Sequence, residues 1–417
     1  MPNQRVLVIG SGGREHALCW HLSQHEAKVY CAPGSDGIAQ DFETFSFSDY
    51  AELAQKISSL KIDHVIVGPE KYLADGIADD LSSRGISVFG PTRAASLLEA
   101  DKAWAKMFCL RHQIPTAKTA VVRSKDELVS ALKTFEAPYV VKASGLAAGK
   151  GVWIGNNLPG AVAFGDDALK GHSSVVVEEF IKGEELSFFV MVEGTRFLIL
   201  GSAQDHKRLL ENDEGPNTGG MGAYSPVPIS TPELEQKIIE KILKPTLQGL
   251  DKEKLFYRGF LFLGVMIRNH EPYLLEYNCR MGDPETQALL MRLETSLMSL
   301  IHSLSGDPLT PQLSRKVSLN VVVAARGYPD RPEEGFDLSP LKELPSGSRL
   351  FHSGTSRKQG GWVAKGGRLF SINTAQSSLL KCQQVVYPWL EALPCQKQIS
   401  YRKDIAVKAY RHLLDSN

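Results

Sequence analysis

The chain has 417 residues, which at about 150 residues per domain predicts two to four domains. Its 47 lysines and arginines balance 47 aspartates and glutamates, and a net charge of zero argues against binding to nucleic acid or an acidic membrane. Hydrophobic residues make up 43% without any run of about 18 apolar residues, so we expect a globular fold with no transmembrane helix.

The first hundred residues alternate short apolar runs with helical stretches. Strands are predicted at residues 5–9, 29–31, 64–67 and 87–89. The strands are almost entirely apolar, as expected for a parallel sheet that is buried on both faces. This alternation predicts a doubly wound α/β domain over residues 1–101. The N-terminal residues lack the pattern of a signal peptide.

A second domain is expected over residues 102–316, with a smaller subdomain at about 119–185. Helices are predicted at residues 93–112, 126–135 and 232–249, and strands at 119–122, 139–142, 175–179, 260–267 and 273–278. A small C-terminal α+β domain is expected at 317–417. Its predicted elements are strands at 317–323 and 368–372 and a helix at 375–387, with a loop-rich stretch at 326–361.

A first glycine cluster closes the first strand just before a helix. Gly10 and Gly12 fit a dinucleotide fingerprint, but its third glycine is replaced by Glu15 and the second strand ends without an acidic residue. Binding of NAD is therefore disfavoured. The cluster, including Gly13, still suits a phosphate at the helix N-terminus, with Arg14 adding positive charge. The alternative is a tight turn with no ligand.

A second glycine-rich loop begins at Gly145, directly after the strand that ends at Lys142. It is not a Walker loop, because Gly145 and Gly149 are too close together and Gly151 replaces the hydroxyl residue that would bind magnesium. Small residues nevertheless let backbone amides approach a polyphosphate, and Lys150 adds a charge. A phosphate clamp is favoured over a surface loop.

Glu276 and Asn278 lie two residues apart at the end of an apolar strand, so their side chains share one face. A carboxylate and an amide oxygen suit a hard cation such as Mg²⁺, which needs few protein ligands beside nucleotide phosphates. Arg280 follows directly and favours this interpretation over a solvated strand end.

An acidic turn follows the strand at 175–179. Backbone groups near Glu178 and Ile181 could contact an adenine edge and Glu185 could accept ribose hydroxyls, but taken alone these residues favour an acidic surface turn. Two polar segments at 204–208 and 215–226 are dense in glycine and hydrogen-bonding groups, which is typical of substrate recognition.

In this order, the motifs resemble the phosphoribosylamine–glycine ligase family, ATP-grasp enzymes of purine biosynthesis. The resemblance rests on residues 10–18, 66–70, 145–151, 204–208, 215–226, 276–286, 351–355 and 402–405. Two residues depart from the family pattern: Ser144 stands where Asp is usual, and Arg326 replaces a glycine. We expect Ser144 to be peripheral and to tolerate Asp.

The resemblance implies an ATP-grasp domain with a mobile lid subdomain. It implies that ATP, with Mg²⁺ or Mn²⁺, drives ligation of glycine to 5-phosphoribosylamine through a glycyl phosphate. The catalytic set would be Arg280, Lys142 and Asp205, with the metal on Glu276 and Asn278. ATP would contact Lys102, Lys142, Gly145, Gly149, Lys150, Gly151, Glu178, Glu179, Ile181 and Glu185. The other substrates would contact Gly10, Gly12, Gly13, Arg14, Glu70, Asp205, Pro216, Asn217, Thr218, Gly219, Gly220 and Asp283.

Three other functions are weighed against this one. They are another ATP-grasp carboxylate–amine ligase or biotin-carboxylase-like enzyme, an NAD-linked oxidoreductase, and a nucleotide-binding regulator without activity. The expected partners are small-molecule substrates only, with no nucleic acid or membrane, and the protein would be a monomer or weak homodimer. Six scattered cysteines without metal-binding spacing indicate reduced thiols and a cytoplasmic location.

Overall fold

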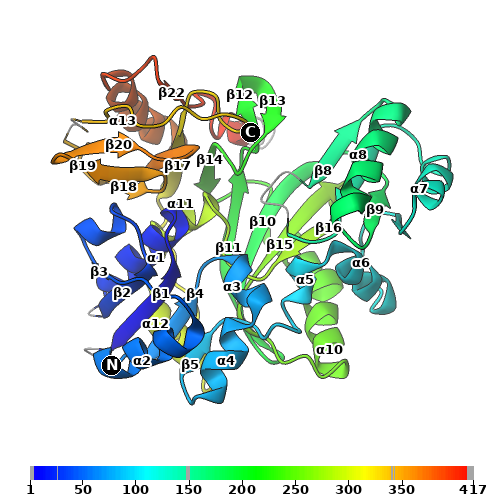
Figure 1. Cartoon of the computed structure of the whole chain (residues 1–417), viewed down its shortest axis with the longest axis horizontal. Helices are drawn as coiled ribbons and strands as arrows, with labels where there is room; N and C mark the ends of the chain where they lie inside the picture. Colours follow the sequence, from blue (N-terminus) through cyan, green and yellow to red (C-terminus); the bar gives the residue numbers. More distant parts are fainter. Residues whose placement is uncertain (1–3, 26, 147–150, 340, 342, 411–417) are drawn as a thin grey trace.

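A computed structural model describes residues 4–25, 27–146, 151–339, 341 and 343–410. The chain forms mixed α/β layers, with the N-terminal domain and a small outer subdomain on opposite sides of the central strands (Figure 1). This confirms the expected fold class. None of the helices in the described ranges is long and apolar enough to cross a membrane.

The N-terminal domain is a five-stranded parallel sheet in the order β3-β2-β1-β4-β5. Its strands are β1 (Arg5–Gly10), β2 (Lys28–Pro33), β3 (Glu43–Thr44), β4 (His64–Val67) and β5 (Ser87–Phe89). Its helices are α1 (Gly13–Ser23), α2 (Tyr50–Leu60), α3 (Glu70–Asp75) and α4 (Ile77–Ser83). Residues 6–9 of β1 are fully buried, which explains the uninterrupted apolar sequence of that strand.

The outer subdomain has a four-stranded antiparallel sheet in the order β6-β9-β7-β8. Its elements are β6 (Thr119–Val122), α7 (Lys125–Leu132), β7 (Tyr139–Ala143), β8 (Val152–Gly155), α8 (Leu158–Gly171) and β9 (Val175–Glu178). Both helices pack on this sheet around a separate apolar core that includes Leu128, Val141 and Val177. The subdomain therefore has its own core, at the position predicted for the lid.

One large sheet connects the ATP-grasp and C-terminal parts of the chain, in the strand order β16-β15-β10-β11-β14-β17-β21-β18. Its strands are β10 (Glu184–Glu193), β11 (Arg196–Asp205), β14 (Gly222–Ser225), β15 (Arg258–Arg268), β16 (Glu271–Asn278), β17 (Val317–Ala325), β18 (Ser348–His352) and β21 (Arg368–Gln376). Strands β14 and β17 pair from Gly222–Val321 to Ser225–Ser318, so the sheet continues across the predicted boundary at residue 317.

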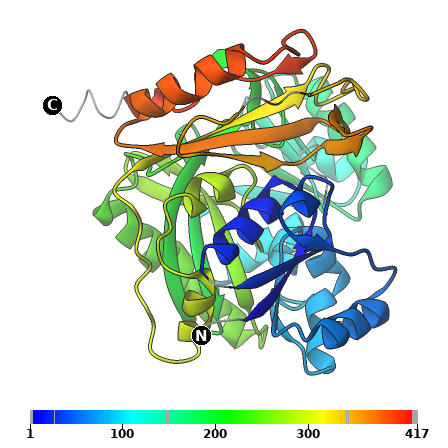
Figure 2. The ribbon, with the colours of Figure 1, turned by 90° about the vertical axis from the view of Figure 1, so that its left-hand side faces the viewer.

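Further elements cover this sheet or project from it. They are α9 (Pro232–Ile238), the π-helical turn η3 (Ile239–Leu243), α10 (Lys244–Lys252), α11 (Glu285–Leu290), α12 (Leu297–Leu304), α13 (Leu379–Glu391), β22 (Ile399–Ser400) and the hairpins β12–β13 (Arg208–Leu210, Glu214–Asn217) and β19–β20 (Thr355–Lys358, Gly361–Ala364). Figure 2 shows α13 across the C-terminal strands, on the side away from the N-terminal domain.

Two predicted helices differ from the structure, and two long strands were not predicted. The helix expected at 93–112 is broken into α5 (Leu97–Ala100) and α6 (Lys102–Arg111), because Asp101 has an extended backbone and caps α6. The helix expected at 375–387 begins later, since β21 runs to Gln376 and Ser378 caps α13. The ten-residue strands β10 and β11 were not predicted.

Candidate active site

A cleft of about 450 Å³ opens where the N-terminal domain, the lid, the large sheet and the C-terminal strands meet. Arg14 and Glu70 line it from the N-terminal domain, Lys142 from the lid, Glu276 from β16 and Arg368 from β21. Residues far apart in the sequence therefore face one enclosed volume, and we take this cleft as the candidate active site.

All five predicted catalytic and metal-binding residues lie in the cleft wall. The predicted residues that line it are Arg14, Glu70, Lys102, Lys142, Gly151, Asp205, Thr218, Gly219, Glu276, Asn278, Arg280 and Asp283. The described predicted residues outside its lining are Gly10, Gly12, Gly13, Gly145, Glu178, Glu179, Ile181, Glu185, Pro216, Asn217 and Gly220. Gly149 and Lys150 lie outside the described residues.

One wall of the cleft is built from lysines paired with a buried carboxylate. Glu178 accepts contacts from Lys142 Nζ at 2.7 Å and from Lys106 Nζ at 2.9 Å. Burial alone would raise the pKa of Glu178, but the two lysines outweigh it and lower that pKa. Both carboxylate oxygens are thus engaged by the lysines. Lys106, one helical turn from Lys102 on α6, was missed because nothing local marks it as functional.

The predicted metal ligands face the cleft from the end of β16. A bulge shifts the register, so Glu276 pairs with Gly264 and Leu274 with Val265. Burial opposes ionisation of Glu276, but Lys207, Lys142 and Lys102 together lower its pKa. The carboxylate is therefore charged at neutral pH.

Asn278 is 7% exposed, and its side-chain nitrogen has no hydrogen-bond partner within the described part of the chain. No group of three or more His, Cys, Asp or Glu side chains among the described residues is arranged to hold a metal. A two-residue oxygen site fits a cation that takes its other ligands from nucleotide phosphates and water.

Arg280 is fixed by two carboxylates from the N-terminal part of the chain. Its Nε lies 3.1 Å from Glu70 Oε2 and its Nη2 lies 2.8 Å from Glu99 Oε1. Burial would lower the pKa of Arg280, but Glu99 and Glu70 raise it, so the guanidinium remains charged. Glu99 also accepts a hydrogen bond from the Cys279 amide at 2.7 Å, and Cys279 itself is buried in the core. Glu99 was not predicted.

Asp205 and its neighbours form a polar cluster beside the metal ligands. Lys207 Nζ lies 2.7 Å from Glu185 Oε2, and Ser187 donates to Glu285 Oε1 at 3.1 Å. Burial raises the pKa of Asp205 to about 8, although Lys207 opposes the shift. Asp205 is consequently poised to exchange a proton near neutral pH.

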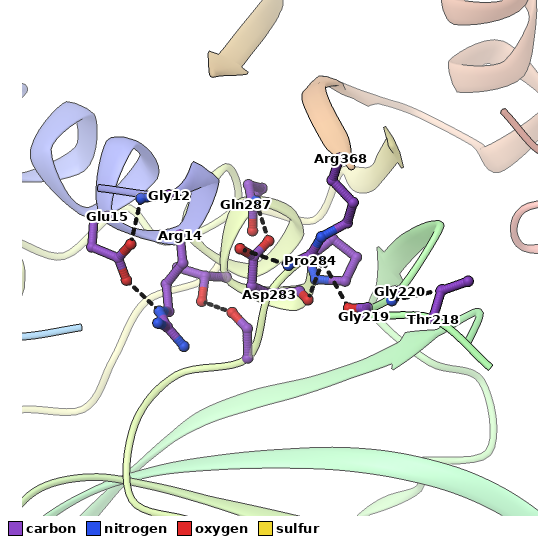
Figure 3. A network of polar contacts seen from close by, with 12 residues as sticks. Gly12, Arg14, Glu15, Thr218, Gly219, Gly220, Asp283, Pro284, Gln287 and Arg368 are labelled. Carbon is purple, nitrogen blue, oxygen red and sulfur yellow. Dashed lines mark hydrogen bonds and ion pairs between the residues drawn. The ribbon is translucent and has the colours of Figure 1, made fainter. Parts of the chain in front are cut away.

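The first glycine cluster encloses a side chain of its own. The Gly12 amide donates to Glu15 Oε2 at 2.7 Å, and Glu15 also contacts the guanidinium of Arg14 (Figure 3). Gly10 has a φ of +134°, and a Cβ there would lie 2.4 Å from Glu15 Cγ. Glu15 thus fills the space that these glycines leave, and Arg14 is the part of the segment that lines the cleft.

Residues of the C-terminal region form another wall of the cleft. Arg368 donates to the carbonyl oxygens of Gly219 and Asp283, both at 2.7 Å, and its Nη2 lies 3.2 Å from Asp283 Oδ2 (Figure 3). The Gly219 amide donates to Tyr328 Oη at 2.9 Å. Arg368 and Tyr328 were not predicted, because sequence spacing does not reveal that they meet the segment at 215–226.

Comparison with known proteins covers nearly the whole chain. Three family models match in succession, described as "Phosphoribosylglycinamide synthetase" N domain (residues 4–99), ATP-grasp (A) domain (100–286) and C domain (318–408). A phosphoribosylamine–glycine ligase of Brucella melitensis is 41% identical, covering 97% of this chain and 98% of its own. One from Ralstonia nicotianae is 40% identical, covering 98% and 100%.

Solved structures show the same arrangement. A crystal structure of phosphoribosylamine–glycine ligase from Thermotoga maritima superposes with a TM-score of 0.84 at 34% identity, covering 96% of this chain and all of that one. A biotin carboxylase domain from Hydrogenobacter thermophilus superposes with a TM-score of 0.72 at 16% identity, covering 95% and 90%, a likeness of fold alone.

Proposed function

The chain belongs to the phosphoribosylglycinamide synthetase family, and on this premise we propose how its residues divide the reaction. It is an ATP-dependent ligase of purine biosynthesis that joins glycine to 5-phosphoribosylamine. Its family uses ATP with a divalent metal. The observation that carries the assignment of roles is the convergence of Lys102, Lys142, Glu276, Asn278 and Arg280 on one cleft.

The first step makes the glycine carboxylate reactive. A carboxylate oxygen of glycine attacks the γ-phosphorus of ATP, the bond to the β–γ bridging oxygen breaks, and ADP leaves. Lys102 and Lys142 neutralise charge on the transferring phosphoryl group. Glu276 and Asn278 would hold the cation, Mg²⁺ or Mn²⁺, which when bound screens the phosphate charges.

The second step forms the amide bond. The amine of 5-phosphoribosylamine attacks the carbonyl carbon of glycyl phosphate, the carbon–oxygen bond to phosphate breaks, and inorganic phosphate leaves. Arg280, held by Glu70 and Glu99, binds the acyl phosphate. Asp205, whose pKa burial raises to about 8, lines the cleft as a hydrogen-bond donor to the substrates. The proton that the amine releases leaves with the inorganic phosphate, and no side chain is assigned to accept it. Confinement of the reactants supplies much of the rate.

The acceptor substrate occupies the side of the cleft formed by Arg14, Glu70, Asp283 and the Thr218–Gly219 backbone. The partners are thus small molecules. The proposed location is the cytoplasm, supported by six free cysteines that are all buried. A monomer or weak homodimer remains the prediction for the oligomeric state.

The assay that tests this assignment measures ADP formation with each substrate omitted in turn. We expect turnover to require glycine and 5-phosphoribosylamine and not to be supported by bicarbonate. A bicarbonate-dependent ATPase would instead favour a biotin-carboxylase-like enzyme. Glycine labelled with heavy oxygen in its carboxylate should transfer one label per turnover to inorganic phosphate. Unlabelled phosphate alongside normal product would contradict the glycyl phosphate route.

A further inference from the structure

Ser144, one of the two residues that depart from the family pattern, is buried and hydrogen-bonded to the start of α6. It follows β7 directly and is 5% exposed. Its hydroxyl donates to Asp101 Oδ1 at 2.6 Å and accepts a hydrogen bond from the Ala103 amide at 3.0 Å. Asp101 in turn accepts from the Trp104 amide at 2.9 Å. Two first-turn amides of α6 are therefore satisfied by a serine–aspartate pair from two separate segments.

This pair lies at the point where α6 meets the glycine-rich loop. Lys102, the residue after Asp101, donates from Nζ to the Gly145 carbonyl at 2.9 Å, and Gly145 is the residue after Ser144. Three hydrogen bonds, from Ser144, Ala103 and Lys102, thus join the first turn of α6 to the end of β7. Lys102 and Lys142, both in the cleft wall, are carried by the two segments that the pair connects.

We propose that Asp101 and Ser144 form a positioning pair that holds Lys102 and the start of the glycine-rich loop in register for the nucleotide. We further infer that the carboxylate and the hydroxyl are exchangeable between the two positions. The inference rests on the proposed function only in taking the ligand of this wall to be ATP. It assigns no contact with the nucleotide to Asp101 or Ser144 themselves.

The exchange follows from the geometry of the hydrogen bonds. A carboxylate at position 144 would accept from the Ala103 amide and from a serine hydroxyl at 101, while that hydroxyl would accept from the Trp104 amide, because serine is also a favoured helix N-cap. Aspartate at 144 alone would instead place two carboxylates in contact at a site where Ser144 is buried. The hydrogen bonds of Ser144 therefore argue against the expectation that this position tolerates Asp.

The test compares S144D, D101S and the double variant D101S/S144D with the wild-type protein. ATP affinity is measured by isothermal titration calorimetry with a non-hydrolysable ATP analogue, and kcat and KM for ATP by ADP formation. The matched control is S124D, which makes the same change at an exposed helix N-cap on the lid. Melting temperature is recorded for every variant, so that unfolding is separated from misplacement of Lys102.

We expect S144D to weaken analogue binding and raise KM for ATP at least about tenfold, since a hydrogen bond involving a charged group is lost and repulsion is added. D101S should show a smaller loss, and the double variant should return to within about threefold of wild type while S124D stays unchanged. If S144D does not fold, recovery of both melting temperature and ATP affinity in the double variant still supports the proposal.

Two results would overturn it. One is S144D binding the analogue as tightly as wild type. The other is a double variant no better than S144D, which would show that the pair is not exchangeable. If the wild-type protein binds no ATP analogue, the proposed function is refuted. The pairing is still tested in that case, because the melting temperature of D101S/S144D can be compared with that of S144D.

Discussion

The two sides of the cleft use different cations. The side that we propose for the nucleotide carries lysines, and Lys106 and Lys142 share the buried carboxylate of Glu178. The side that we propose for the acceptor and the acyl phosphate carries arginines. Arg280 lies between two glutamates, and Arg368 contacts the Gly219 carbonyl, the Asp283 carbonyl and the Asp283 carboxylate. An ammonium is a compact charge on a flexible stem, whereas a guanidinium holds several partners in a fixed plane.

This difference matches what each side must do. A phosphoryl group moves during transfer, and lysine ammonium groups can follow it by rotating their stems. On the proposed assignment, the acceptor is held in one place, which suits the planar donors of arginine. The following variants test this difference between the lysine side and the arginine side of the cleft.

The largest effect is expected for Lys142→Met. It removes a charge from the nucleotide side and leaves Glu178 with Lys106 alone. We expect kcat to fall roughly a hundred- to a thousandfold, as when one preorganised donor is lost from a transition state. The measurement is ADP formation, with Lys170→Met, an exposed lysine on the lid helix α8, as the control. A loss below tenfold would show that Lys142 does not face the transferring group.

Glu276→Gln should act through the metal. Loss of a charged ligand is expected to raise the Mg²⁺ concentration needed for half-maximal activity by about ten- to a hundredfold, with partial recovery at excess Mg²⁺. The control is Glu271→Gln on the same strand, a partly exposed carboxylate paired with Lys237 and Lys241. Wild-type activity of the Glu276 variant at limiting Mg²⁺ would exclude the metal assignment.

Arg368→Lys tests the acceptor side. A lysine cannot hold the Gly219 and Asp283 carbonyls together with the Asp283 carboxylate, so we expect KM for 5-phosphoribosylamine to rise about tenfold while KM for ATP is unchanged. Arg349→Lys, an exposed arginine on the neighbouring strand β18, is the control. Equal effects on both KM values would mean that Arg368 supports the fold in general and not the acceptor side.

The smallest effect concerns Asp205 and pH. The pKa of Asp205 is about 8 in the folded protein and near 3.8 in the unfolded chain. Between pH 3.8 and pH 8, the folded protein therefore keeps a proton that the unfolded chain has released. This contribution to stability is present at acidic pH and is lost as the pH rises through about 8. Asp205→Asn should therefore reduce the fall in melting temperature between about pH 5 and pH 8 by a few degrees. An unchanged pH profile would show that Asp205 is not protonated in the folded protein.

The sequence predicted those parts of the site that depend on local regularity. Strand alternation placed Glu276 and Asn278 on one face, and both line the cleft. The strand-end position of Lys142 similarly predicted its place in the wall. The apolar runs predicted the parallel sheet of the N-terminal domain, because burial on both faces leaves a simple pattern.

Other features depend on contacts between distant residues and could not be predicted. Glu99 and Arg368 act at the site only because the fold brings them to Arg280 and Asp283. The break at Asp101 was missed because the residues on both sides have ordinary helix propensity, and the cap became visible only with its partner Ser144. Glu15 was interpreted as an interruption of a glycine motif, whereas its side chain is what those glycines accommodate.

The pairing of β14 with β17 has a consequence for how the chain can be divided. Residues after 317 match a separate family model, yet their first strand completes the sheet that carries the cleft. Cutting the chain there would leave the backbone donors and acceptors of β14 as an open sheet edge, which favours intermolecular strand pairing. Fragment complementation, chimaeras and domain transplants between relatives should therefore keep β14 and β17 in the same piece, whereas the lid, with its own core, is the natural unit to exchange.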